Sequence, residues 1–191
     1  MYYLTSRISD FAENFYSDIL NNLDVATKEY ILKKKKTEAQ KTSLLALYLL
    51  KNGLSEFYGI GSCKILRTEK GKPYLEDNKV YFSISHTKGI AAVAFSEHPI
   101  GIDIEYTRKY SAVAERMFDD IERKYALQSD LNFTKIWTLK EAAVKATGQG
   151  IADAKNISFR LSPEKITASI PDAEMFQTVN NGLVISICEI K

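Results

Sequence analysis

The sequence has few of the residues that build disulfide frameworks or histidine-based metal sites. It contains only two cysteines, Cys63 and Cys188, and two histidines, His86 and His98. The cysteines show no paired spacing, so we expect no disulfide framework, and this usage is typical of a reducing cytoplasm. Two histidines are too few for a zinc site built from histidine ligands.

Long apolar runs and a charge excess of one sign are also missing. The longest apolar run, residues 44–50, is far shorter than the roughly 20 residues of a membrane-spanning helix, so we expect no membrane partner. The first residues lack the basic-then-apolar order of a signal peptide, which again favours the cytoplasm. A net charge of +2 argues against a general nucleic-acid binder but leaves room for a local basic patch.

What is present predicts an α+β domain. Four segments have helical apolar spacing, and the helix around Thr42 to Leu50 is apolar nearly all round and expected to end near Asn52-Gly53. Gly148 is expected to cap the last helix as a left-handed residue. The predicted helices cover residues 10–23, 42–50, 111–127 and 133–147.

Short strands separated by turn signals supply the β part. Three of them, at 80–85, 90–95 and 100–105, are separated by tight turns and predict an antiparallel meander. In the first strand the apolar residues should face inward and the alternating residues, Tyr81, Ser83 and Ser85, outward. The inward residues are Val80, Phe82 and Ile84. Further short strands are expected between 157 and 190, around Ser162-Pro163 and a hairpin turn at 180–182.

The strand at 100–105 carries acids on one face. Ile100, Ile102 and Ile104 alternate with Asp103 and Glu105, so the isoleucines suit a core and the two carboxylates share the opposite face. The plain interpretation is a half-exposed strand with solvated acids. The functional interpretation is a cation site, because neighbouring carboxylates repel one another unless water or a cation lies between them.

The helix at 133–147 carries a second group of polar residues. Trp137, Glu141 and Lys145 are spaced by four and share one helix face. A glutamate four residues before a lysine is also an ordinary surface pair. The lysine run at 33–36 also has two interpretations, because it suits either a solvated surface or an anion site.

Taken together, these residues suit phosphate chemistry. Asp103, Glu105 and Glu141 offer hard oxygen ligands of the kind that Mg²⁺ accepts alongside substrate phosphates. Lysines can balance phosphate charge, and Ser85 and His86 follow a strand with a hydroxyl and an imidazole. Carboxylates for a metal and lysines for phosphates are typical of phosphoryl-type transfer.

The order of these motifs resembles that of a known family. Gly101-Ile102-Asp103-Ile104-Glu105, followed by Trp137-x-x-Lys140-Glu141-Ala142-x-x-Lys145, resembles the paired signature of the 4′-phosphopantetheinyl transferases. Gly71-Lys72-Pro73 and Ser85-His86-Thr87 match two further motifs of the larger, monomeric, surfactin-synthetase-activating type. The resemblance runs from about residue 42 to residue 150.

The resemblance implies a fold and a reaction. The fold would be two similar α+β halves, residues 1–98 and 99–191, each with a small antiparallel sheet and helices, packed as a pseudo-dimer with the active site between them. The reaction would be Mg²⁺-dependent transfer of the phosphopantetheine arm of coenzyme A to a serine of an apo acyl or peptidyl carrier protein. Adenosine 3′,5′-bisphosphate would be released.

The resemblance also assigns roles to residues. Magnesium would be held by Asp103, Glu105 and Glu141. Coenzyme A and its phosphates would be contacted by Ser43, Lys72, Ser85, His86, Asp103, Lys140 and Lys145, with the basic segment 33–41 nearby. The catalytic residues would be Glu122, Glu141 and Lys145, with Glu122 as the base for the serine hydroxyl.

Two departures from the family pattern leave the metal ligands untouched. Ser83 stands where the family often has asparagine, and the N-terminal basic positions, commonly arginines, are lysines here. Two other functions use similar residues. A catalytically idle relative that only binds coenzyme A or carrier protein should lack a metal ligand or Lys145, and neither is lost. A Mg²⁺-dependent phosphohydrolase or nucleotidyl transferase should show a phosphate-binding glycine loop or a second metal cluster, and the sequence shows neither.

Overall fold

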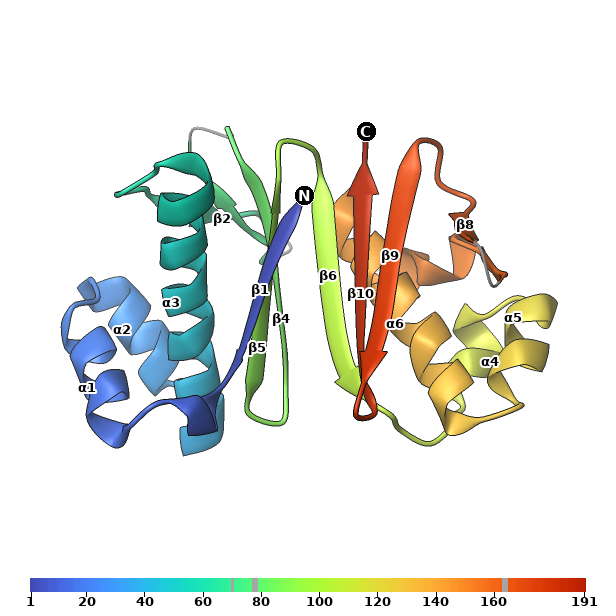
Figure 1. The fold of residues 1–191 in the computed structure, drawn as a ribbon, viewed down its shortest axis with the longest axis horizontal. Helices are drawn as coiled ribbons and strands as arrows, with labels where there is room; N and C mark the ends of the chain where they lie inside the picture. The colour runs from blue at the N-terminus through green and yellow to red at the C-terminus, as the bar shows by residue number, and fades with distance from the viewer. Residues whose placement is uncertain (70, 77–78, 163–164) are drawn as a thin grey trace.

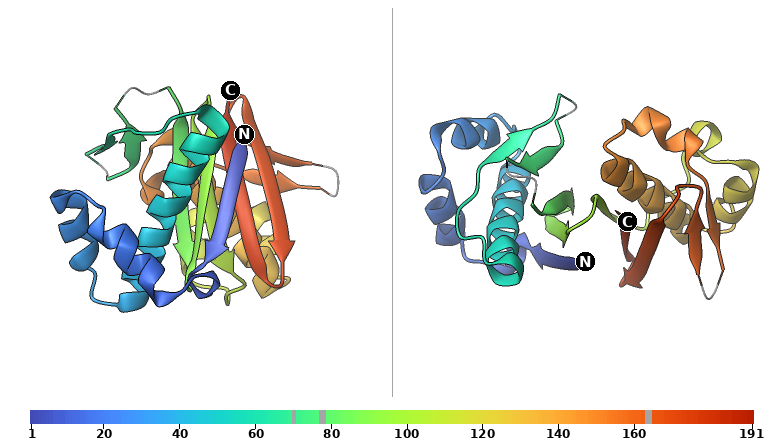
Figure 2. Two further views of the ribbon diagram at one scale, coloured as in Figure 1. Left: turned by 60° about the vertical axis from the view of Figure 1, so that its left-hand side comes forward. Right: turned by 90° about the horizontal axis from the view of Figure 1, so that it is seen from above.

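The computed structural model confirms the α+β class. It describes residues 1–69, 71–76, 79–162 and 165–191. Strands occupy the middle of the molecule, and helices cover the two outer sides (Figure 1). Seen from above, the helices of the first and second parts of the chain lie on opposite sides of the strands (Figure 2, right).

The first part of the chain is built on one long helix packed against a sheet. Within the described residues, β1, β5 and β4 form an antiparallel sheet in that order, and β2 pairs with β3. The elements are β1 (Tyr2–Arg7), η1 (Ile8–Asp10), α1 (Glu13–Asn21), α2 (Val25–Leu32), α3 (Thr37–Tyr58), β2 (Ile65–Arg67), β3 (Pro73–Leu75), β4 (Tyr81–Thr87) and β5 (Ile90–Ser96).

Helix α3 continues beyond the end that the sequence predicts. The expected stop at Asn52-Gly53 is wrong, because Gly53 lies inside the helix, where the ring of Phe95 leaves no room for a side chain. The helix ends instead at Gly59, which adopts a left-handed conformation with φ of 66°. Gly53 is therefore a close-packing residue, and its place in the sequence only resembles a helix stop.

The predicted meander is correct for two strands and wrong for the third. β4 and β5 pair as an antiparallel hairpin through a turn at Lys88 and Gly89. The next strand, β6 (Ile100–Tyr106), pairs with β10 near the C-terminus instead of with β5. The reason is that β1 already occupies the free edge of β5, so the chain crosses after residue 96 into another sheet.

The second part of the chain repeats the pattern of a sheet beside a long helix. Here β6, β10 and β9 form an antiparallel sheet in that order, and β7 pairs with β8. The elements after β6 are α4 (Val113–Met117), α5 (Asp120–Ala126), α6 (Asp130–Thr147), η2 (Ile151–Asn156), β7 (Phe159–Leu161), β8 (Ile166–Ala168), β9 (Ala173–Asn180) and β10 (Leu183–Ile190).

Several local predictions hold in this part and one does not. Gly148 ends α6 with φ of 71°, and Asn181 with Gly182 turns the β9–β10 hairpin, as predicted. The single helix expected over 111–127 is wrong, because Asp119 breaks it and caps α5 by accepting from the backbone N–H groups of Ile121 and Glu122. Pro163, in the other predicted turn, lies outside the described residues.

The two sheets meet along β4 and β6. Isoleucines 100, 102 and 104 of β6 join apolar residues of β5 and β10 in one buried cluster, so the predicted apolar face of this strand is confirmed. Ser83 and Ser85 of β4, predicted to face outward, are buried instead, because their hydroxyls accept hydrogen bonds from the backbone N–H groups of Ile102 and Ile104. The junction thus brings the predicted acid face beside the serine-histidine motif.

The proposed division into residues 1–98 and 99–191 falls in the turn between β5 and β6 and stays a prediction. Among the described helices, none has the length and apolar character that crossing a bilayer requires.

Candidate active site

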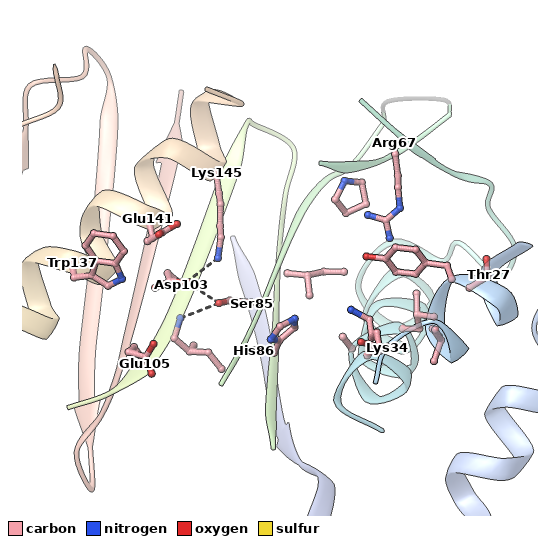
Figure 3. Close-up of a pocket in the computed structure, with 18 of the residues that line it drawn as sticks. Thr27, Lys34, Arg67, Ser85, His86, Asp103, Glu105, Trp137, Glu141 and Lys145 are labelled. Carbon is pink, nitrogen blue, oxygen red and sulfur yellow. Dashed lines mark hydrogen bonds and ion pairs between the residues drawn. The ribbon is translucent and has the colours of Figure 1, made fainter. Parts of the chain in front are cut away.

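A cavity of about 520 Å³ opens where the two sheets meet, within the size range of small-molecule sites. Side chains from both parts of the chain line it (Figure 3). The predicted site residues among its lining are Ser43, Ser85, His86, Asp103, Glu105, Glu141 and Lys145. The structure therefore brings together most of the residues singled out in the sequence, although they come from α3, β4, β6 and α6.

Asp103 lies at the centre of this arrangement and is nearly buried. Its Oδ1 accepts hydrogen bonds from the Ser85 hydroxyl and from the Lys145 ammonium group, each at 2.8 Å. Lys145 also donates to the backbone carbonyl of Ile102 at 3.0 Å. These two donors fix the orientation of the Asp103 carboxylate at the cavity.

Glu105 lies two residues further along the same face of β6. It accepts a hydrogen bond from Thr87 at 2.8 Å and lies 3.8 Å from the guanidinium of Arg108. Arg108 in turn lies over the Trp137 ring, 5.6 Å from its centroid. This side of the cavity therefore combines a carboxylate, a guanidinium cation and an aromatic ring.

Glu141 reaches the cavity from α6, and Gly101 sets how close that helix can come. A β-carbon at Gly101 would collide with the backbone carbonyl of Ala142, so only glycine allows this approach of helix and strand. The close approach puts Glu141 and Lys145 beside Asp103. Burial, and after it the charge of Asp103, raises the pKa of Glu141 above its usual value.

The opposite wall of the cavity is basic. Lys34 from the lysine run and Arg67 from β2 both line it, together with His86 and the half-buried Ser43. Ser43 donates its hydroxyl to the Ala39 carbonyl at 2.8 Å, as a serine inside a helix commonly does. Partial burial of the His86 ring, together with the nearby charges of Lys34 and Lys145, holds the pKa of His86 below its usual value.

Lys72 lies next to the cavity rather than in its described lining, and its predicted contact with coenzyme A stays a prediction. Its ammonium group donates to the backbone carbonyl of Lys145 at the C-terminal end of α6, and it lies outside the described lining of the cavity. A lysine at a helix C-terminus interacts favourably with the helix dipole. Burial lowers the pKa of Lys72. Its contact therefore links the first part of the chain to the helix that carries Lys145.

Lys140 and Glu122 are the clearest departures from the predicted site. The two form a buried ion pair at 2.9 Å, with side chains 1% and 0% exposed. Glu122 also accepts from the backbone N–H groups of Asp119 and Phe159, at 2.8 and 2.7 Å. Lys140 also donates to the carbonyls of Ala154 and Ile157. Both groups are thus committed to the packing of α5, α6 and η2, and neither belongs to the described lining of the cavity.

These contacts differ from what the two predicted roles require, and the roles themselves stay predictions. A general base must reach the hydroxyl that it deprotonates, and a phosphate contact must face the ligand. Glu122 and Lys140 do neither in this structure. The spacing of Lys140 next to Glu141 could not reveal this, because adjacent helix residues point about 100° apart and only one of them can face the cavity.

The predicted magnesium ligands line one cavity, but their side chains are not gathered closely enough to form a metal-binding group. In the described parts of the chain, no group of three or more His, Cys, Asp or Glu side chains stands ready to hold a metal ion. The donor chemistry nevertheless fits Mg²⁺. Asp103, Glu105 and Glu141 are hard oxygen ligands around one cavity, and none of the described residues hydrogen-bonds to the Glu141 carboxylate. A cation would relieve the repulsion between Glu141 and Asp103.

Among the lining residues that the sequence interpretation missed, Tyr30, Arg67 and Arg108 carry polar or charged groups. None belongs to a recognisable motif. Arg67 ends a three-residue strand just before the Gly71-Lys72-Pro73 turn, and that turn is the one signal that placed its surroundings near the site.

Comparisons with known proteins agree with the geometry. The sequence model of the 4′-phosphopantetheinyl transferase superfamily matches residues 99–188. The 4′-phosphopantetheinyl transferase HetI of Nostoc sp. is 35% identical over 132 residues, which cover 60% of this chain and 55% of the relative. The 4′-phosphopantetheinyl transferase Sfp of Bacillus subtilis is 32% identical over 149 residues, covering 72% and 66%. The matches thus span about half to two thirds of the length of these relatives.

Proposed function

Because the chain belongs to the 4′-phosphopantetheinyl transferase superfamily and resembles its Sfp-like type, we propose that it transfers the phosphopantetheine arm of coenzyme A to a serine of an apo carrier protein. One observation carries the proposal beyond family membership. The cavity has carboxylates and Lys145 on one wall and Lys34, Arg67 and His86 on the other. Such a two-sided site suits a substrate with a pyrophosphate and a separate phosphate, as coenzyme A has.

Lys145 is the residue assigned to the pyrophosphate. Its ammonium group lies among the cavity carboxylates, where it donates to Asp103. An ammonium group that contacts a phosphate oxygen forms a charge-assisted hydrogen bond, roughly twice as strong as a neutral one. Lys72 supports Lys145 through its backbone carbonyl, so its assigned role is positional.

Asp103, Glu105 and Glu141 are the residues that would hold Mg²⁺. A bound magnesium ion would neutralise charge on the pyrophosphate and make the departing phosphate a better leaving group. The protein holds these carboxylates in place in two ways. Gly101 lets α6 approach β6, and the Ser85 hydroxyl on β4 donates a hydrogen bond that orients Asp103.

The transfer itself moves one bond and one proton. The serine oxygen of the carrier bonds to the phosphorus that bears the pantetheine arm, and the bond from that phosphorus to the bridging oxygen breaks. Adenosine 3′,5′-bisphosphate leaves with the bridging oxygen. The bridging oxygen gains negative charge as its bond breaks, so the serine proton would pass to a phosphate oxygen of the departing bisphosphate, and the three carboxylates stay assigned to the metal.

The family resemblance adds three predictions to this proposal, which concern the organisation of the chain, its compartment and its acceptor. The chain would work as a monomer of two similar halves, 1–98 and 99–191, with the site between them. It would act in the cytoplasm, on an acyl or peptidyl carrier protein. The position of the cavity, between the sheet of β4 and the sheet of β6, supports the first of these.

Mass spectrometry of apo carrier proteins tests the proposal. Acyl, peptidyl and aryl carrier proteins incubated with the protein, coenzyme A and Mg²⁺ should each be examined for the added mass of one phosphopantetheine on the acceptor serine. A carrier protein whose acceptor serine is replaced by alanine should gain nothing. If every carrier keeps its starting mass, the proposed function is wrong.

A further inference from the structure

A chain of buried hydrogen bonds ties the middle of α6 to the sheet that it packs against. Thr138 on α6 and Ser186 on β10 are both fully buried, and their hydroxyl oxygens lie 2.7 Å apart. The side-chain amide of Gln177 on β9 donates to the Ser186 hydroxyl at 2.8 Å and to the backbone carbonyl of Lys135 at 3.0 Å. We call Thr138, Ser186 and Gln177 the Thr138 network.

The hydrogen bonds of the Thr138 network run in one direction. Thr138 donates its hydroxyl to backbone carbonyls of the preceding helix turn, that of Thr134 at 3.0 Å and that of Lys135 at 3.1 Å. A hydroxyl carries a single hydrogen, so the Ser186 hydroxyl is the donor in its 2.7 Å contact with Thr138. Ser186 in turn accepts from Gln177. The network therefore links β9, β10 and α6 with a partner for each group.

The Thr138 network lies beside the candidate active site without belonging to it. Ser186 is directly opposite Asp103 in the pairing of β10 with β6, so the two side chains lie on the same face of the sheet. Thr138, Glu141 and Lys145 are spaced by three and four residues, which places them on one side of α6. Neither Thr138 nor Ser186 belongs to the described lining of the cavity. Any effect on the reaction has to act through the residues that do.

The other polar contacts between α6 and this sheet do not hold the helix throughout the reaction. Gly101 permits a close approach, but without a side chain it forms no bond that would stop the helix from rotating or sliding. Lys145 bonds to Asp103 and to the carbonyl of Ile102, yet the proposed reaction turns its ammonium group toward the pyrophosphate. Among the described residues, the Thr138 network then supplies the remaining side-chain hydrogen bonds between α6 and the strands β6, β9 and β10.

We propose that Thr138 and Ser186 are positioning residues that fix the rotation of α6 on the sheet during the reaction. Glu141 and Lys145 then keep their places beside Asp103 when the substrate binds. The proposal rests on the proposed function, because it takes these residues as the ones that serve magnesium and the pyrophosphate. A displacement of about 1 Å caused by a change far from the chemistry can cost about 100-fold in rate, so the network affects kcat without touching the substrate.

Urea denaturation of single and double variants measures the structural part of this role. Thr138→Val keeps the shape of the side chain and removes its oxygen, which leaves the buried Ser186 hydroxyl without its acceptor. It should lower the unfolding midpoint by about 0.5–1.5 M. The double variant Thr138→Val with Ser186→Ala leaves neither hydroxyl behind, so its midpoint should return most of the way to that of the parent. Gln177 keeps its bond to the Lys135 carbonyl.

Transfer activity should not return with stability. In Thr138→Val, Ser186→Ala and the double variant, kcat should be about 10- to 100-fold below that of the parent, while KM for the carrier protein stays within about twofold. Thr138→Ser keeps the hydroxyl and should retain about half of the parent's kcat or more. Thr42→Val is the matched control and should leave kcat unchanged, because Thr42 is a buried threonine of α3 that donates to the Glu38 carbonyl of its own helix.

Recovery of both stability and kcat in the double variant would show that the pair only satisfies its own hydrogen bonds, and the assignment would be wrong. A kcat of Ser186→Ala equal to that of Thr42→Val would overturn it as well. Circular dichroism at the assay temperature shows which variants are folded. If Thr138→Val is not, Ser186→Ala decides, since it leaves Thr138 bonded to its own helix.

A crystal structure of the double variant separates this proposal from the proposed function, because it does not depend on transfer. Relative to β6, α6 should be displaced by about 1 Å, with Glu141 and Lys145 farther from Asp103 than in the parent. A helix in its original place would overturn the positioning role. If the parent modifies no carrier protein, the proposed function fails, and the displacement of α6 alone decides the positioning role.

Discussion

Removing the ammonium group of Lys140 should destabilise the protein strongly and leave coenzyme A binding nearly unchanged. The Lys140 and Glu122 side chains are almost fully buried and lie 2.9 Å apart. Lys140→Met would leave the Glu122 carboxylate buried without its cation. Breaking a buried pair in this way typically costs 3–5 kcal/mol, and the backbone N–H donors of Asp119 and Phe159 offset only part of that cost.

Urea denaturation measures this cost. With a slope of about 2 kcal/mol per molar urea, a loss of 3–5 kcal/mol lowers the unfolding midpoint by about 1.5–2.5 M. Lys135→Met, which changes a partly exposed lysine of the same helix, should shift the midpoint by much less. The double variant Glu122→Gln with Lys140→Met should lose less stability than the sum of the single changes, because the two residues interact directly.

The same variants decide between a structural and a ligand-binding role. Because Lys140 lies outside the described lining of the cavity, the folded Lys140→Met protein should keep its affinity for coenzyme A within about a factor of two, well under the tenfold that 1.4 kcal/mol represents. A stability loss below about 1 kcal/mol, together with a tenfold loss of affinity, would refute the reasoning and return Lys140 to the phosphate site.

Three further changes have distinct expected results. Glu141→Gln should abolish transfer, as an activity assay would show. The unliganded variant should be as stable as the parent or slightly more so, because the charge of Asp103 repels the Glu141 carboxylate in the parent. A clear fall in its melting temperature would argue against this repulsion. Gly101→Ala should destabilise the fold by about 1–3 kcal/mol or more through collision with the backbone of α6, and an unchanged urea midpoint would contradict the packing. Lys72→Ala should lower transfer in the parent but add little to Lys145→Ala, measured as a double-mutant cycle in kcat and KM; full additivity would mean that Lys72 acts independently of Lys145.

Much of the fold could be predicted from local patterns. The alternation in residues 100–105 correctly gave the apolar face of β6, and Gly148 and Asn181-Gly182 marked a helix end and a hairpin through their backbone preferences. Strand pairing could not be read in this way. Nothing local in residues 97–99 shows that β6 leaves its neighbour β5 for β10, because that choice depends on β1 covering the edge of β5.

The candidate site likewise combines residues that the sequence could predict with residues whose place depends on the packing of the whole chain. Asp103, Glu105, Glu141 and Lys145 lie around one cavity, and the sequence interpretation grouped them from residue chemistry and the motif resemblance. Glu122 and Lys140 belong to the same motif pattern, yet they neutralise each other in the core, and sequence spacing does not record burial. Arg67 was missed for the opposite reason, since its place beside Tyr30 arises only from the packing of β2 near α2.

The location of bound coenzyme A and metal tests the account most directly. A crystal structure with coenzyme A and Mn²⁺, collected so that the anomalous signal marks the metal, should show the pyrophosphate in the cavity between β4 and α6. The metal peak should lie among Asp103, Glu105 and Glu141, and the separate phosphate should lie at Arg67 and Lys34. A metal peak away from these carboxylates, or coenzyme A bound outside this cavity, would contradict the account.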